Sequence, residues 1–325
     1  MCIKEKTEGR RVKKSENTKA ESTTNIDILT TLNMMNYIVY SFFFPYPITM
    51  ETKIFHYLSD KEEFSIMSIT KELDIDDKYM YVHLNDFCSK GVIEKLGYYK
   101  QGNAMYKVID YDKVKEGLRP FSDSLARHQK VYPDRVVRDV YKTLSVLYYS
   151  YTGDKEPQTL TSLLFFAHTI YSKFCNRIIT KGRRQLTRAF ILYYISVFGS
   201  LNPRKLHRLM PASTASNISA TAKLMQKQGF VTISKEKDTY LDISLTENGI
   251  SMLKEYLENA KFAFDEIYGE AKHNKEFILA FRGANETGSE ILKLNKDVLS
   301  TTAWHLDRVK EGGMLVMPKD DEEDE

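Results

Sequence analysis

The apolar positions of the chain recur mostly at the spacing of amphipathic helices, interrupted by short extended runs. A first ordered set lies in residues 49–109. The predicted segments are a helix at 49–58, an extended piece at 63–67, helices at 68–74 and 77–90, and extended runs at 92–99 and 104–109. We expect Ser68 to cap the second helix and Gly91 to end the third. Gly102 and Asn103 between the last two runs predict a hairpin connection.

The same order of segments returns further along the chain. The predicted segments are helices at 186–198, 203–209 and 213–228, extended runs at 230–234 and 240–245, and a long helix at 247–268. Asn202, Ser213 and Thr246 are the expected N-caps. The two sets keep one register, because Lys90-Gly91-Val92-Ile93 and Gln228-Gly229-Phe230-Val231 lie 138 residues apart. The pattern therefore predicts a structural repeat.

The remaining apolar patterns predict helices that connect and flank these sets, at 112–132, 135–151, 160–179 and 276–305. The expected fold is mainly α with small β-wings: two tandem winged helix-turn-helix domains joined by long helices. The expected boundaries are a disordered basic tail at 1–25, a first winged-helix domain at 26–110, a helical linker at 111–156, a second such domain with flanking helices at 157–310, and an acidic disordered tail at 311–325.

Charge is distributed unevenly along a chain whose total is nearly balanced, with a formal net charge of +3. No Asp or Glu occurs from Pro157 through Lys235. The basic residues of that stretch are Lys173, Arg177, Lys181, Arg183, Arg184, Arg188, Arg204, Lys205, Arg208, Lys223, Lys227 and Lys235. A field of one sign attracts polyanions and makes their binding salt-dependent. The sequence therefore predicts double-stranded DNA as a partner.

This basic stretch contains the helix that a helix-turn-helix places in the major groove. That helix begins at Ser213, and its residues off the inward stripe are Thr214, Ser216, Asn217, Lys223 and Lys227. Short hydroxyl and amide side chains can bond to base edges or phosphates. The residues expected to anchor phosphates beside it are Arg183, Arg184, Arg188, Arg204, Lys205, Arg208, Lys235 and Lys237.

Residues from about 158 to 305 resemble the MarR family of winged-helix regulators. The resemblance is carried by Leu201–Leu209 and Ser213–Gly229, by Gly229-Phe230-Val231, which is similar to the family's Gly-Leu-Val, and by Leu245-Thr246-Glu247-Asn248-Gly249, which is similar to its Leu-Thr-Glu-x-Gly. It implies transcription regulation, terminal helices that dimerise and a wing in the minor groove. The family's wing carries Asp-x-Arg, whereas this chain has Asp238-Thr239-Tyr240, so Lys235 and Lys237 are the basic residues left to serve there.

The tandem pattern leaves several readings open. A homodimer or an intramolecular pair of the two units would each supply two DNA-reading helices. Residues 77–90 of the first unit combine mixed charge with aromatic side chains, which suits a protein partner as well as DNA. The alternatives to a regulator are a plasmid or phage replication or partition initiator and a protein-interaction scaffold. The acid-free stretch argues against the scaffold and leaves the initiator open.

No enzyme motif, phosphate loop or metal-ligand spacing is found, so we expect a non-enzymatic protein without a cofactor. Cys2, Cys88 and Cys175 stand alone in the sequence, which favours a reducing, cytoplasmic compartment. Cys175, between Lys173 and Arg177, is expected to be structural, with redox sensing as the alternative. The longest apolar run, at 189–198, is short of the roughly 20 residues that a membrane helix needs, so no membrane contact is expected.

Overall fold

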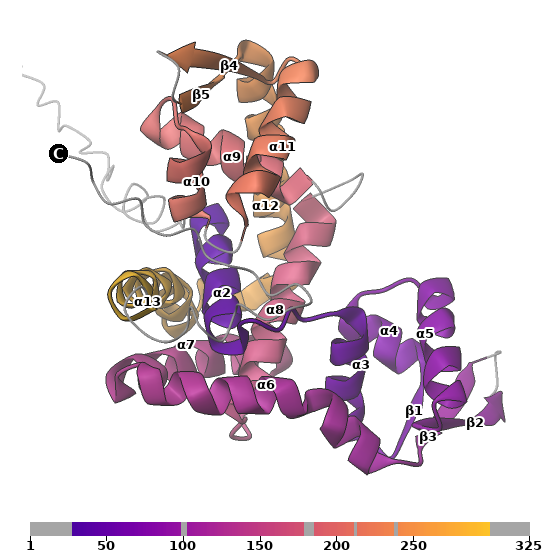
Figure 1. Ribbon diagram of the computed structural model, residues 1–325. Coiled ribbons are helices and arrows are strands. Elements are labelled where there is room, and N and C mark those ends of the chain that lie inside the picture. Colours follow the sequence, from indigo (N-terminus) through magenta and orange to yellow (C-terminus); the bar gives the residue numbers. More distant parts are fainter. Residues whose placement is uncertain (1–27, 99–102, 179–184, 211–212, 237–239, 300–325) are drawn as a thin grey trace, which may run out of the picture.

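The structure is a computed structural model, and it describes residues 28–98, 103–178, 185–210, 213–236 and 240–299. It is mainly helical with two small antiparallel sheets (Figure 1), as the sequence predicts. The elements up to the middle of the chain are α2 (Ile28–Phe43), α3 (Met50–Leu58), β1 (Glu63–Ser65), α4 (Ile66–Leu73), α5 (Asp77–Ser89), β2 (Ile93–Tyr98), β3 (Ala104–Val108), α6 (Tyr111–Val131) and α7 (Asp134–Thr152). The others are α8 (Leu160–Ile178), α9 (Gln185–Phe198), α10 (Pro203–Leu209), α11 (Ala215–Lys227), β4 (Val231–Glu236), β5 (Tyr240–Leu245), α12 (Glu247–Tyr268), the 3-10 turn η1 (Gly269–His273) and α13 (Lys275–Leu299).

The first unit, α3 to β3, packs around a small core of its own. Its sheet has the strand order β1-β3-β2, and Phe64 pairs with Tyr106 in it. The predicted cap of α4 is wrong: Ser65 caps the helix, and Ser68 is its third residue. The two serines form a capping box, in which each hydroxyl accepts from the other's main-chain N–H. Both are capping residue types, and the reciprocal pair is possible only with the helix starting at Ile66.

The second unit, α9 to β5, has its helices and strands in corresponding places. α11 and β4 begin and end 138 residues after α5 and β2. Gly91 and Gly229 follow helices α5 and α11 with φ of 66° and 77°, a backbone region that favours glycine. The main-chain N–H of Val92 donates a hydrogen bond to the carbonyl of Phe87, and that of Phe230 donates to the carbonyl of Met225, both at 3.0 Å. The two helices therefore end with the same hydrogen bond. A bridge between Leu201 and Ile243 takes the position that β1 holds in the first unit.

The second unit shares one large core with the helical body formed by α2, α6, α7, α8, α12 and α13. Helix α2 was not predicted, because its sixteen residues include no charged side chain to mark a polar face. Although α2 falls within the interval expected for the first domain, it packs against α8 and α13. Asn33 of α2 donates to the hydroxyl of Tyr194 at 2.8 Å and to the carbonyl of Leu209 at 2.7 Å, which ties the helical body to the second unit.

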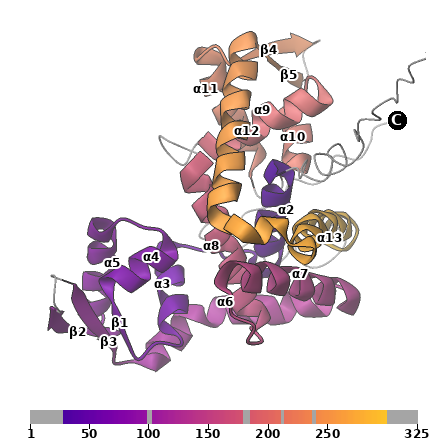
Figure 2. The ribbon, with the colours of Figure 1, turned by 180° about the vertical axis from the view of Figure 1, so that it is seen from behind.

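The first unit projects from one side of the helical body, and the second unit lies at another extremity (Figures 1 and 2). Helix α6 runs from the small core, where Val114 is buried, into the large core, where Phe121 and Leu125 are buried. Within the described ranges, no helix combines the length and the apolar character needed to cross a membrane.

Candidate nucleic-acid interface

Helix α10 holds three basic residues on an exposed face. Asn202 caps the helix by accepting from the main-chain N–H of Lys205 at 2.8 Å, and Pro203 occupies the favoured first position. Leu206 is fully buried, so the opposite face carries Arg204, Lys205 and Arg208, all exposed.

Helix α11 lies against α10 and presents a polar face. Its buried stripe is Ile218, Thr221, Ala222 and Met225. The sequence-predicted residues on the other side, all exposed, are Thr214, Ser216, Asn217, Lys223 and Lys227. This polar face and the three basic residues of α10 are called the basic face below.

The start of α11 corrects the predicted cap. Thr214, and not Ser213, is the N-cap: its hydroxyl accepts from the main-chain N–H of Asn217 at 3.2 Å. Ser213 is half-buried in the turn, where its carbonyl accepts from Nδ1 of His207 at 2.7 Å. The sequence alone does not single out His207, although its spacing of six residues from Ser213 spans the turn. The bond fixes α10 to the turn just before α11, and Ser216 and Asn217 are exposed polar residues in the first turn of that helix.

Most cations of the basic face are not neutralised by nearby carboxylates in the described part of the chain. Lys205, Arg208, Lys223 and Lys227 pair with no carboxylate among the described residues. No acidic residue occurs in the sequence of α10 or α11. Cations without carboxylate partners exchange their water for phosphate oxygens at low cost, so the face suits a polyanion.

Other predicted contact residues lie elsewhere. Arg183, Arg184 and Lys237 lie outside the described residues, and Lys235 is in β4. Arg188 is half-buried on α9, and its Nε is enclosed without a hydrogen-bond partner in the described part of the chain. Its charge acts on Tyr256 of α12, where burial raises the pKa of the phenol and Arg188 counteracts that rise. Helices α9 and α12 pack together, and the charge of Arg188 therefore acts on α12, an effect that sequence spacing alone could not reveal.

Two basic residues of the acid-free stretch are engaged inside the molecule. Lys173 is buried, and its ammonium donates to the hydroxyl of Tyr151 at 2.7 Å. Arg177 pairs with Asp74 and Glu266. Neither charge contributes to the basic face, and both are directed to partners other than Cys175, which packs against the large core.

The Leu245–Gly249 segment fixes the strand pair to α12. The Thr246 hydroxyl donates to the carbonyl of Gly229 at 2.7 Å and accepts from the main-chain N–H of Gly249 at 3.1 Å. A Cβ at Gly249 would lie 2.1 Å from the carbonyl oxygen of Phe230, so only glycine allows this approach. The motif therefore holds the end of α11, the β4–β5 pair and the start of α12 together.

Comparisons with known proteins give the following. No family model matches the chain, and no curated protein matches it. One similar solved structure is a probable transcriptional regulator from Pseudomonas aeruginosa, with 22% identity and a TM-score of 0.31 over 37% of this chain and 90% of that chain. Another is an organohalide-sensing transcriptional regulator in its ligand-free form, with 20% identity and a TM-score of 0.33 over 49% of this chain and 94% of that chain.

Within the described residues, no three His, Cys, Asp or Glu side chains are grouped so that they could hold a metal ion.

Proposed function

We propose that the chain is a sequence-specific double-stranded DNA-binding protein that regulates transcription. The observation that carries this proposal is the basic face: a capped helix with exposed hydroxyl and amide groups at its start, flanked by exposed cations and free of acids. Helix α11 would enter the major groove and present Ser216 and Asn217 to base edges. Arg204, Lys205 and Arg208 of α10 would hold phosphates beside that helix.

In this proposal the two units are tandem winged helix-turn-helix domains, and the second is of the MarR type. The β4–β5 pair is its wing, and the register shared by α5 with α11 and by β2 with β4 supports the tandem arrangement. A chain with two such units can occupy two half-sites either alone or as a homodimer. The units differ chemically, so a single chain would select an asymmetric site.

The first unit would supply the second DNA contact. Lys78 and Asn85 of α5 are exposed at the positions that match Ser216 and Lys223 of α11. A second candidate for this unit is a protein partner, because Val82 of α5 is 66% exposed and Tyr98 of β2 is 68% exposed. Exposed apolar side chains of this size are more typical of protein contacts than of phosphate contacts.

A salt series on duplex DNA of random sequence tests the electrostatic part of the proposal. The change is the triple variant Lys205→Ala/Arg208→Ala/Lys223→Ala, and the matched control is Lys254→Ala/Lys261→Ala/Lys275→Ala, which removes three exposed cations from α12 and α13. Each phosphate-binding cation that is removed should reduce the slope of log K against log salt by about 0.9, so the slope of the first variant should be smaller by about 2–3. The control should keep the slope of the unaltered chain. Equal slopes in both variants would contradict the proposal.

A further inference from the structure

The two cores are joined by a helix that is weakened between them. Leu118 of α6 packs against both cores, and Gly117 and Pro120 lie on either side of it. Pro120 has no N–H to donate to the preceding turn, and helices bend at such positions. A Cβ at Gly117 would lie 2.5 Å from the Phe55 ring, so α3 sits directly on this segment. Because of Pro120, helix α6 by itself constrains the angle between the first unit and the rest less than an unbroken helix would.

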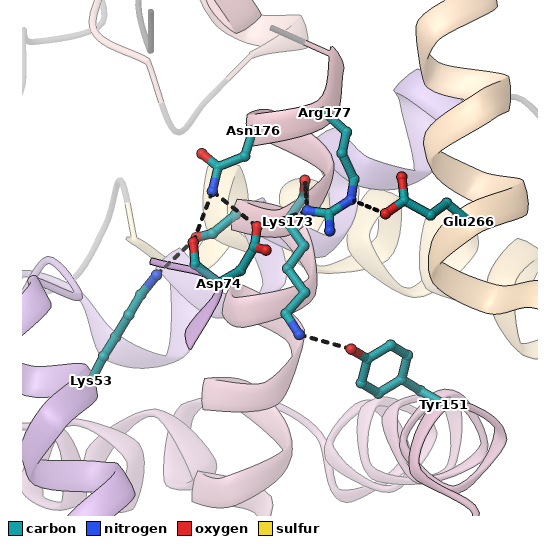
Figure 3. Close-up of polar contacts among 8 residues, drawn as sticks. Lys53, Asp74, Tyr151, Lys173, Asn176, Arg177 and Glu266 are labelled. Carbon is teal, nitrogen blue, oxygen red and sulfur yellow. Dashed lines mark hydrogen bonds and ion pairs between the residues drawn. The ribbon is translucent and has the colours of Figure 1, made fainter. Parts of the chain in front are cut away.

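A second connection runs through Arg177, near the end of α8. Its Nη1 donates to Oδ2 of Asp74 at 2.7 Å, and its Nε donates to Oε1 of Glu266 at 3.0 Å. Asn176 adds bonds to the same Asp74, at 3.2 Å to Oδ2 and 3.4 Å to the carbonyl. Figure 3 shows the Arg177 guanidinium between the two carboxylates. Asp74, Arg177 and Glu266 are called the clamp below.

The clamp ties the turn before α5 to α8 and α12, two helices of the large core that the second unit shares. Asp74 ends α4 and begins the short turn that leads into α5, whereas Glu266 lies on α12, the helix that leaves β5. Arg177 itself lies just before the segment that leads to α9. One guanidinium thus connects the turn of the first unit, the α8 helix and the α12 helix.

The backbone conformation of Asp74 is unusual for an aspartate at a helix end, and its charged carboxylate faces Arg177. Asp74 has φ 55° and ψ 56°, a left-handed conformation in which Gly or Asn is the usual residue. Burial raises the pKa of its carboxyl, but hydrogen bonds from Arg177 and Asn176 outweigh burial, and the pKa lies below its ordinary value. The carboxylate is therefore charged at neutral pH, and its charge faces Arg177.

Further contacts across this junction involve α3. Nζ of Lys53 donates to Oγ of Ser172 at 2.9 Å, and the His56 ring stacks on Phe165 with centroids 4.3 Å apart. These contacts hold α3 on α8. The clamp adds a contact of set direction to them, because the planar guanidinium donates one hydrogen bond to each of two carboxylates.

We propose that Arg177 is a positioning residue that fixes the angle between α5 and α11, so that the chain prefers a bipartite DNA site of one spacing. This inference rests on the proposed function. Two linked units bind jointly only when both reach their sites at once, so a fixed angle selects one spacing and a loose angle accepts several. The variant Arg177→Ala should loosen the angle without changing the surface of either unit.

A distance measurement without DNA tests the angle. Spin labels are placed at Ser89→Cys and Lys227→Cys, the exposed ends of α5 and α11, in a chain whose three native cysteines are replaced by Ala. The matched control is Arg135→Ala, because Arg135 also bridges two acids, Asp139 and Glu290, but within the helical body. The unaltered chain and the control should give one narrow distance distribution, and Arg177→Ala a broad one. A narrow, unshifted distribution for Arg177→Ala would overturn the proposal.

A second clamp variant guards against a folding effect of Arg177→Ala. Asp74→Asn keeps a residue that tolerates the left-handed conformation and removes only the charge. It should broaden the distribution as well, and Arg177→Lys should fall in between, because an ammonium lacks the planar fork with which the guanidinium donates one bond to each carboxylate. A narrow distribution for Asp74→Asn would count against the clamp.

Binding to a site selected from random duplex DNA tests the spacing. Inserting about 5 base pairs, half a helical turn, between its halves should weaken the unaltered chain and Arg135→Ala about tenfold or more. The affinity of Arg177→Ala should differ less than about threefold between the selected site and the site with the insertion, and its affinity for an isolated half-site should equal that of the unaltered chain. General destabilisation would not produce this combination. If the unaltered chain binds no DNA, the proposed function fails. If it selects one uninterrupted half-site, the proposed function stands and the role of Arg177 fails.

Discussion

Gly249 offers a sharp test of how the second unit is held together. In Gly249→Ala, the new Cβ would lie 2.1 Å from the carbonyl oxygen of Phe230, a main-chain atom that cannot rotate away. The first turn of α12 must move, at an overpacking cost of about 1–3 kcal/mol. The move also weakens the Thr246 cap, worth about 1 kcal/mol. The higher helix propensity of alanine relative to glycine offsets about 1 kcal/mol of this cost. The expected net loss is about 2 kcal/mol.

Urea unfolding followed by circular dichroism measures this loss, and Gly283→Ala is the matched control. Gly283 lies inside α13, and a Cβ there would meet only Oγ1 of Thr143 at 3.5 Å, an ordinary contact. The control should therefore be neutral or gain up to about 1 kcal/mol. The Gly249→Ala midpoint should fall clearly below that of the unaltered chain. Equal stability of Gly249→Ala and Gly283→Ala would refute the close approach of α12 to Phe230.

Further predictions concern caps and pH. Thr214→Ala removes the hydroxyl that caps α11 and should cost about 1 kcal/mol in urea unfolding, whereas Ser213→Ala should cost little; the reverse order would restore the cap predicted from sequence. Burial lowers the pKa of His56 to about 4. The unfolded chain therefore takes up this proton at higher pH than the folded chain, and stability falls from about pH 6.5 to pH 4, by about 3 kcal/mol in full. His56→Gln should flatten that part of the pH profile of unfolding, and an unchanged profile would show that His56 is not responsible.

Much of the fold was predictable because the residues that begin and end its helices act locally. Gly91 and Gly229 mark the helix ends, and Thr246 and Asn202 mark helix starts, since each acts on main-chain atoms within a few residues. The start of α4 was misplaced by the Ser65–Ser68 pair, in which either serine fits a cap. Helix α2 was missed because it is buried almost all round.

The candidate site was predictable in part for a related reason. The exposed residues of α10 and α11 follow from helical periodicity, which the sequence displays directly. The partners of Lys173 and Arg177 do not, because Tyr151, Asp74 and Glu266 lie far away in the sequence or on another helix. A run of basic residues in the sequence therefore overestimates the number of cations available to bind DNA, because some of them are engaged in long-range contacts inside the molecule.

The most direct test of the central claim is DNA selection with the unaltered chain and with Ser216→Ala/Asn217→Ala. Both side chains are exposed at the start of α11, so the change leaves the helix and the cations of α10 in place. We predict that the unaltered chain enriches a defined site and that the variant loses preference at adjacent base pairs of that site while keeping most of its salt-dependent affinity. An identical preference in the variant, or no enriched site for the unaltered chain, would contradict base reading by α11.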